Sequence, residues 1–272
     1  MSALRVRLGL AACAGAVFAG LAAPAKAAEP LLPRDGWVSW DVPVGDAPAW
    51  CCFNDWNERN APPSACKLDG HNNGYGTRHD ERTDTVTVYA RASAGKLDRV
   101  RVLSATCPVD TKTEVQEQTV TPDESTRWLL AQVKNESSTG RNSLSDDALA
   151  ALSMHRGDLA REGMIKLGND DPRAGIRSKT WFWLAMGGAP GVESPISAAV
   201  RKDPDDDVRE QAVFALSRLP DERATRALIA AAEDRSLSRE QRKRAVFWLV
   251  QSDSPAALAF LDKVLTVSAT RK

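Results

Sequence analysis

The chain has 272 residues, which is enough for one large domain or two ordinary ones, and 43% of them are hydrophobic, as in a globular protein. Lysine plus arginine equals aspartate plus glutamate at 36 each, so no overall field draws the chain to nucleic acid or to an anionic membrane surface. The composition therefore argues against a nucleic-acid binder, and the function has to be sought in local patterns.

The first segment, residues 1–28, has the three parts of a secretory signal peptide. Arg5 and Arg7 precede an apolar run over residues 8–23, and small residues suited to cleavage follow it. We expect this segment to be removed and the mature protein to be periplasmic or secreted from a bacterial cell. No later apolar run approaches the roughly 20 residues that a transmembrane helix needs.

A lipoprotein signal is the alternative interpretation of the same segment. Leu10-Ala11-Ala12-Cys13 has the form of a lipobox, which would place a lipid anchor on Cys13. The apolar run is very short before Cys13 and continues well beyond it, so an ordinary signal peptide is favoured.

The segment 36–134 is expected to form a small β-rich domain. Residues 85–90 and 97–103 alternate between apolar and polar side chains, and turn-forming residues lie between them, which predicts a β-hairpin. A further strand is expected near residues 37–42. The polar stretch 55–84 is interpreted as a long loop that a cross-link holds in place.

Four cysteines remain after the signal peptide, namely Cys51, Cys52, Cys66 and Cys107. An even number of cysteines in an exported chain predicts two disulfides. A direct bridge between the adjacent Cys51 and Cys52 is disfavoured because its geometry is strained. Each of these two therefore bonds to Cys66 or to Cys107, and two connectivities stay open.

A helix is predicted at the end of this domain. Thr121 is suited to the N-cap, Pro122 to the first helical position, and Glu124 to the third position of a capping box. We expect the helix to run to about Lys134. The polar residues 135–143 then form the linker to a second domain.

The rest of the chain, residues 144–267, repeats itself. Segments 177–184, 209–216 and 242–249 align without gaps at spacings of 32 and 33 residues. One more step back places residues 145–152 in the same register. A period of this length indicates stacked helical hairpins, so we expect about four of them.

Each copy pairs two kinds of helix. The first is apolar on most sides, as in residues 212–216, and is expected to be buried. The second keeps its apolar residues to one side, and these residues are Val192, Ile196, Ala199, Val200, Ala224, Leu228, Ala231, Ala232, Ala257, Leu261, Val264 and Leu265. Its other side can face solvent or a partner.

The stretch 203–216 resembles a bacterial HEAT repeat in its acidic turn, its arginine and its Ala-x-x-x-Leu core. The similarity is good over residues 205–234, weaker in the flanking copies, and leaves the N-terminal half unexplained. It implies a HEAT-like α-solenoid, so the expected fold class is α+β multidomain: a disulfide-linked β-rich domain, then the solenoid. Such solenoids usually bind proteins, which implies a non-catalytic protein-binding or scaffold module with a protein as its partner.

An enzyme or an enzyme accessory is the alternative. Some HEAT-like repeat proteins resemble bilin lyases, although this chain shows no bilin-handling residues. A metal site built from His71, His79 and a carboxylate is another variant, but the spacing matches no finger or zincin pattern. No Ser/His/Asp or Cys/His set stands out, so we expect no catalysis, no cofactor and no metal.

The second helices supply the candidate partner-binding face. In the third copy Leu228 and Ala231 point inward, so Arg226 and Glu233 project the opposite way at about 100° per residue. The repeat period adds equivalent positions in the other copies, which are Glu162, Ser194, Ala259, Asn169, Arg201 and Thr266. We call Glu162, Ser194, Arg201, Arg226 and Glu233 the second-helix face.

Overall fold

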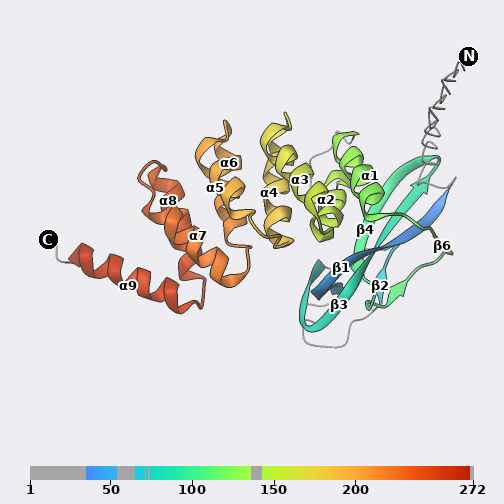
Figure 1. Ribbon diagram of the computed structural model, residues 1–272, viewed down its shortest axis with the longest axis horizontal. Coiled ribbons are helices and arrows are strands. Elements are labelled where there is room, and N and C mark those ends of the chain that lie inside the picture. Colours follow the sequence, from blue (N-terminus) through green and yellow to red (C-terminus); the bar gives the residue numbers. More distant parts are fainter. Residues whose placement is uncertain (1–34, 54–64, 71, 73, 136–142, 270–272) are drawn as a thin grey trace, which may run out of the picture. The chain divides into compact units, whose positions relative to one another are not determined.

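The computed structural model describes residues 35–53, 65–70, 72, 74–135 and 143–269, all of which belong to one unit of the chain. The expected signal peptide with Cys13, His71, and most of the expected linker lie outside these residues. A β-rich first part with two disulfides is followed by helices in HEAT-like hairpins (Figure 1). The predicted fold class is confirmed.

A four-stranded sheet forms the first part. Its strands are β1 (Gly36–Phe53), β3 (Gly74–Ser93), β4 (Lys96–Ser104) and β6 (Val115–Glu117), in the order β4-β3-β1-β6. β3 pairs antiparallel with both β1 and β4, and β6 pairs parallel with β1. A separate two-stranded sheet joins β2 (Cys66–Lys67) to β5 (Val109–Asp110).

The predicted hairpin is confirmed as β3 and β4. Ser93 pairs with Lys96, and the two residues between them, Ala94 and Gly95, have φ values of 51° and 71°. Positive φ at both central positions is the mark of a type I′ turn, whose twist matches that of the strands it joins. Gly95 adopts this conformation without the steric cost that a side chain would add.

The loop expected over residues 55–84 is wrong in its second half. β3 begins at Gly74, and cross-strand pairs from Phe53↔Gly74 to Ala49↔Arg78 extend the β1–β3 ladder. The reason is that β1 continues far beyond the predicted 37–42 and offers β3 a hydrogen-bonding edge. β1 does so through two irregularities in register, which the sequence pattern interrupted by prolines and glycine did not reveal.

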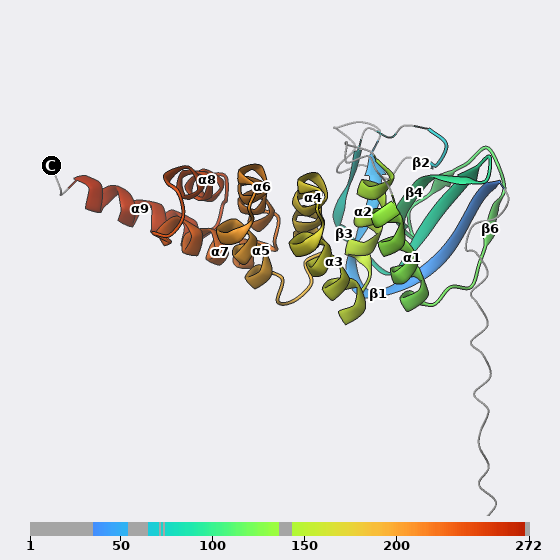
Figure 2. The same cartoon turned by 90° about the horizontal axis from the view of Figure 1, so that it is seen from above.

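One face of the sheet lies under helices α1 (Pro122–Asn135) and α2 (Leu144–Met154), as Figure 2 shows. Trp40 contacts Trp128 of α1 edge to face, with ring centroids 5.4 Å apart, and its indole N–H donates to Ser125 Oγ at 2.7 Å. α2 packs against β4. The predicted capping box at the start of α1 is confirmed, because Thr121 and Glu124 exchange hydrogen bonds.

The disulfides join Cys51 to Cys107 and Cys52 to Cys66, with Cα–Cα distances of 5.7 and 5.6 Å. The structure therefore selects one of the two connectivities that the sequence left open. Both bridges belong to a buried cluster with Trp37. Because Trp37 and Trp40 lie at positions of opposite parity on β1, and Trp40 contacts α1, this cluster covers the sheet face opposite to α1.

Four helical hairpins follow, as predicted. Their first helices are α2, α4 (Ala174–Met186), α6 (Asp206–Leu216) and α8 (Arg239–Val250), and their second helices are α3 (Asp158–Asp170), α5 (Glu193–Lys202), α7 (Asp221–Glu233) and α9 (Pro255–Ala269). Each first helix packs against the first helix of the next copy, and each of α3, α5 and α7 packs against the first helix that follows it.

Helix α1 has the place of a second helix in front of the array. It packs against α2 and α3 in the way that α3 packs against α4 and α5. The side of α2 that faces away from α4 therefore meets the sheet and α1 instead of another hairpin. The domain boundary over residues 135–143 stays a prediction, because α1 contacts both parts and residues 136–142 lie outside the described chain.

The repeated arginine closes the turn before three of the first helices, α4, α6 and α8. Its guanidinium donates to a backbone carbonyl five or six residues upstream, and the pairs are Arg177 to Asp171 O at 2.9 Å, Arg209 to Asp203 O at 2.6 Å, and Arg242 to Leu237 O. A single donor in this position satisfies a carbonyl that the turn leaves without a helical partner.

The apolar side of the second helices is buried in the inner copies but not in the last one. Val200 and Leu228 are buried, whereas Val264 and Leu265 of α9 are exposed. The expectation that Val264 and Leu265 lie on a covered side is wrong, because no hairpin follows α9 within the described residues.

Candidate functional site

All five residues of the second-helix face are exposed. They lie on α3, α5 and α7, while apolar residues of the same helices, such as Ile196 and Leu228, are buried. The structure thus places them along a row of successive second helices, on the side away from the core. That a partner binds there stays a prediction.

The charged members of this face pair only loosely with their own chain. Arg226 lies 3.7 Å from Glu222, and Glu233 lies 4.0 Å from Lys263. Exposed pairs of this kind contribute about 0–1 kcal/mol, so a partner can displace them at little cost.

Arg201 is the exception on this face, because its position is fixed. Its Nε donates to Asp234 Oδ2 at 2.7 Å, across from α5 to the turn after α7. Hydrogen bonds from Ser236 and then from Arg201 lower the pKa of Asp234 to about 2. Arg201 therefore joins two successive copies and is less available to a partner than Arg226.

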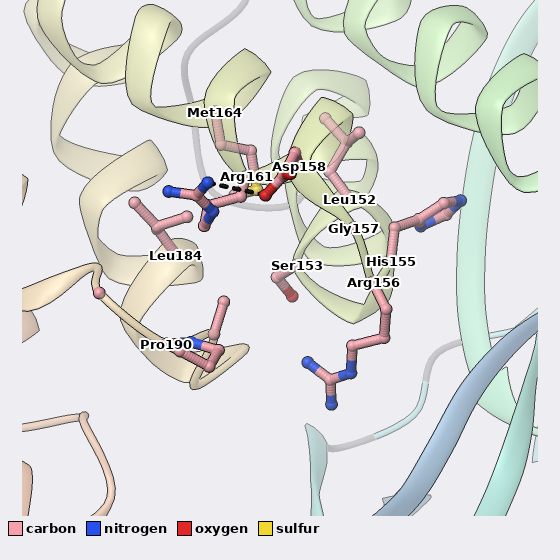
Figure 3. Close-up of a pocket in the computed structure, with 12 residues that line it drawn as sticks. Leu152, Ser153, His155, Arg156, Gly157, Asp158, Arg161, Met164, Leu184 and Pro190 are labelled. Carbon is pink, nitrogen blue, oxygen red and sulfur yellow. Dashed lines mark hydrogen bonds and ion pairs between the residues drawn. The ribbon is translucent and has the colours of Figure 1, made fainter.

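A pocket of about 460 Å³ opens between the α2–α3 turn and the α4–α5 turn (Figure 3). Its floor contains the buried side chains of Leu152, Met164 and Leu184. At its edge Arg161 donates to Asp158 Oδ1 at 2.8 Å. The pocket therefore combines an apolar floor with a charged rim, which suits an apolar side chain that has a polar neighbour.

Arg156 holds one wall of this pocket in place. Its guanidinium donates to Val44 O at 3.2 Å and to Gly187 O at 3.0 Å. Val44 belongs to β1, and Gly187 ends α4. One side chain thus connects the sheet to the first two hairpins at the pocket.

Behind the pocket, His155 belongs to a buried chain of hydrogen bonds. Its Nε2 lies 2.8 Å from Ser125 Oγ and its Nδ1 lies 2.8 Å from Ala151 O. Because the Ala151 carbonyl can only accept, Nδ1 carries the proton and donates to it. In the neutral ring Nε2 then accepts from the Ser125 hydroxyl, whose oxygen accepts the Trp40 N–H. Burial lowers the pKa of His155, so this neutral tautomer is the stable form.

A second surface feature is a row of aromatic rings along the first helices. Neighbouring rings lie 5.0 to 6.1 Å apart between centroids, in the order Trp50, Trp183, Phe182, Phe214, Trp248, Phe247. The guanidinium of Arg218 lies over Phe214 and Trp248 at 4.9 and 5.4 Å. The row begins at the buried ring of Trp50 on β1 and continues through rings that are at least partly exposed to the last hairpin.

The pocket and the aromatic row were not predicted from the sequence. The pocket depends on the turn at Gly157, which has a φ of 104° and an orientation that apolar periodicity does not encode. The aromatic row could have been predicted in part, because Phe182, Phe214 and Phe247 occupy the same position in three copies of the repeat.

The metal hypothesis for the N-terminal part stays a prediction. His71 lies outside the described residues, and the side chain of His79 is not described. Among the residues that are described, no group of three or more His, Cys, Asp or Glu side chains is arranged to hold a metal ion.

The two disulfides are consistent with an oxidising compartment. Within the described part of the chain, no helix is long and apolar enough to cross a membrane.

Comparisons with known proteins give a sequence match to a family model and structural matches at low identity. A search of curated proteins finds no match to the sequence. Human deoxyhypusine hydroxylase in complex with glycerol is similar in structure over 46% of this chain and 42% of its own, at 21% identity and a TM-score of 0.36. This chain thus spans less than half of that protein.

The complex of CpcE and CpcF of phycocyanin lyase from Nostoc sp. PCC7120 is similar over 52% of this chain and 89% of the matched chain, at 19% identity and a TM-score of 0.38. The similarity in sequence is to a family: residues 192–271, which include α5 to α9, match the family model described as HEAT repeats.

Proposed function

We propose that this protein is an exported, non-catalytic binding module that holds a protein partner along the second-helix face. The observation that carries the proposal is the division of α3, α5 and α7 into a buried apolar side and an exposed polar side in register. Stacked hairpins commonly use such an extended surface for partners.

The pocket at the start of α3 supports the proposal as an anchor point. Arg161 on its rim is followed directly by Glu162, and Gly191 on its opposite wall lies three residues before Ser194. The pocket thus lies at the beginning of the second-helix face. A partner side chain buried there would supply the central desolvated contact that dominates most protein interfaces.

Two further observations support the export and the absence of catalysis. The pair of disulfides suits a chain that leaves the cytoplasm after removal of residues 1–28. Ser125 and His155, which would otherwise suggest a nucleophile and its base, are buried and hydrogen-bonded to Trp40 and Ala151. Their role is to connect the sheet to α1 and α2.

Site-specific cross-linking tests the binding face. A photoreactive residue at Ser194 should capture one protein in the native cell envelope. The same residue at Ser93, an exposed serine at the end of β3, is the matched control. Adding Arg226→Glu to the Ser194 probe should reduce capture several-fold without changing the circular dichroism spectrum. Equal capture from Ser93, or capture that Arg226→Glu leaves unchanged, would move the binding site elsewhere.

A further inference from the structure

The large exposed apolar side chains of the described chain gather on its last hairpin. They are Phe247, Val250, Leu258, Val264 and Leu265, all on α8 and α9. Figures 1 and 2 show α8 and α9 at the end of the helical series, with no described helix packed beyond them. A contiguous apolar patch on an otherwise polar surface marks an interaction site.

The repeat register shows what kind of surface this is. Leu265 is 70% exposed, but the equivalent Val200 two copies earlier is 1% exposed. Leu258 is 61% exposed, and the equivalent Thr225 is 2% exposed. These positions are covered in copies that another hairpin follows. The open side of α8 and α9 therefore has the shape and chemistry of a surface on which helices stack.

Two short stripes make up this open side. Lys243, Phe247 and Val250 lie at spacings of four and three residues, and so occupy one side of α8. The corresponding stripe on α9 is Leu258, Asp262 and Leu265, which has the same spacings and therefore the same length of about 10 Å. Each stripe carries two large apolar side chains and one charge.

The charges of the two stripes have opposite signs. Lys243 gives the α8 stripe a positive group, and Asp262 gives the α9 stripe a negative one, and both side chains are exposed. Lys243 pairs with Glu240 of its own helix at 2.8 Å, but exposed pairs of this kind contribute about 0–1 kcal/mol, so Lys243 can exchange Glu240 for another carboxylate. If two copies meet face to face about a two-fold axis parallel to the helices, α8 of one lies on α9 of the other. Each Lys243 then approaches the Asp262 of the other copy, and apolar side chains meet apolar side chains.

We propose that the open side of α8 and α9 binds a second copy of this chain, so that two solenoids join through their last hairpins. A surface with equal stripes of opposite charge is self-complementary, which is the requirement for an isologous two-fold interface. The proposal is independent of the second-helix face, which lies on α3, α5 and α7.

Sedimentation equilibrium of the full chain tests the proposal, over a concentration series that reaches the high micromolar range. We expect a monomer–dimer equilibrium. Leu258→Ser with Leu265→Ser should weaken the dimer at least about tenfold, because each substitution counts twice in a two-fold interface. Both side chains are more than half exposed, so the fold of the monomer should persist, and a thermal melt verifies this.

Charge reversal distinguishes this interface from general stickiness. Lys243→Asp alone and Asp262→Lys alone should each weaken the dimer several-fold, and the double variant should restore it. Lys263→Asp is the matched control, since it changes the neighbouring residue outside the stripe and should leave the dimer unchanged. A chain that stays monomeric, a double variant without rescue, or association only with a different protein would each overturn the proposal.

Discussion

The guanidinium of Arg177 donates two hydrogen bonds to the carboxylate of Asp203, Nε to Oδ2 and Nη2 to Oδ1, both at 2.9 Å. The two side chains are 9% and 5% exposed, and Arg177 also donates to Asp171 O. The pair connects the first helix of the second copy to the turn that begins the third copy. It therefore fixes the spacing between copies from inside the array.

Replacing Arg177 with methionine should lower the free energy of unfolding by about 3 kcal/mol, because it leaves the carboxylate of Asp203 buried without its partner. Arg127→Met is the control, since Arg127 pairs with Asp123 on the surface of α1, and it should cost less than about 0.5 kcal/mol. Urea denaturation measures both. Equal effects of the two substitutions would show that the buried pair has no special role.

Because His155 is buried, we expect the free energy of unfolding to fall in mild acid. Burial lowers its pKa in the folded state, so the unfolded chain takes up a proton first as the pH drops below about 6.5. The free energy of unfolding should then fall by up to about 1.4 kcal/mol per pH unit. His155→Gln should remove this part of the slope, which denaturation at a series of pH values between about 7 and 5 detects.

Asp147 has the opposite effect on the free energy of unfolding over part of the same pH range. It accepts a hydrogen bond from Arg101 of β4 at 2.8 Å, but burial is the larger influence and raises its pKa to about 6. The folded state therefore binds this proton more readily than the unfolded state, which stabilises the fold as the pH falls. The difference between the wild type and His155→Gln isolates the histidine, whereas the wild-type slope alone contains both groups.

The two disulfides should differ in their contribution. Cys51–Cys107 closes a sequence separation of 56 residues and Cys52–Cys66 one of 14. Loop-closure entropy then predicts losses of about 4 and about 3 kcal/mol when each pair is changed to serine. Denaturation followed by tryptophan fluorescence measures the difference. Titration of four free thiols in the non-reduced protein would contradict both bridges.

We expect substitution by alanine to have different effects on stability at two glycines of α3, Gly168 and Gly163. A Cβ at Gly168 would lie 2.5 Å from the ring of the buried Trp181, so Gly168→Ala should cost about 1–3 kcal/mol. A Cβ at Gly163 would meet only the side chain of Leu130, and its two closest atoms are terminal methyl groups that can rotate away. Gly163→Ala should be close to neutral, since alanine favours the helix by about 1 kcal/mol. Thermal melts of both variants provide the comparison.

The helical part was predictable because its determinants are local and repeated. The apolar block over 212–216 and the capping box of Thr121 with Glu124 each act within one or two turns of helix, and the repeat period gave the stacking. The length of β3 was not predictable, because residues 74–84 become a strand only through pairing with the second half of β1. The position of α1 was missed for the same reason, since it depends on contacts with α2 and α3.

The residues of the candidate site also divide into those that local sequence patterns predicted and those that depend on contacts between distant elements. The exposure of Arg226 and Glu233 followed from helical periodicity, but the ion pair of Arg201 with Asp234 joins residues 33 positions apart. The hydrogen bonds that place Arg156 on the pocket wall join residues 112 positions apart, to Val44, and 31 positions apart, to Gly187. Contacts between elements decide such sites, and a single sequence does not contain them.

The contacts of the sheet with α1 and α2 also make the two ends of the helical array unequal in stability. Stability in a stacked array is nearly a sum over copies and their contacts with neighbours, so a copy with two neighbours opens less readily than one with a single neighbour. α2 has the cross-linked sheet on one side and α4 on the other, whereas the main contacts of α9 within the described residues are with α7 and α8, on one side. In the monomer, at concentrations too low for two copies to associate, amide hydrogen exchange should therefore be fastest in α9 and slow progressively toward α2, and the array should open first at the α8–α9 hairpin.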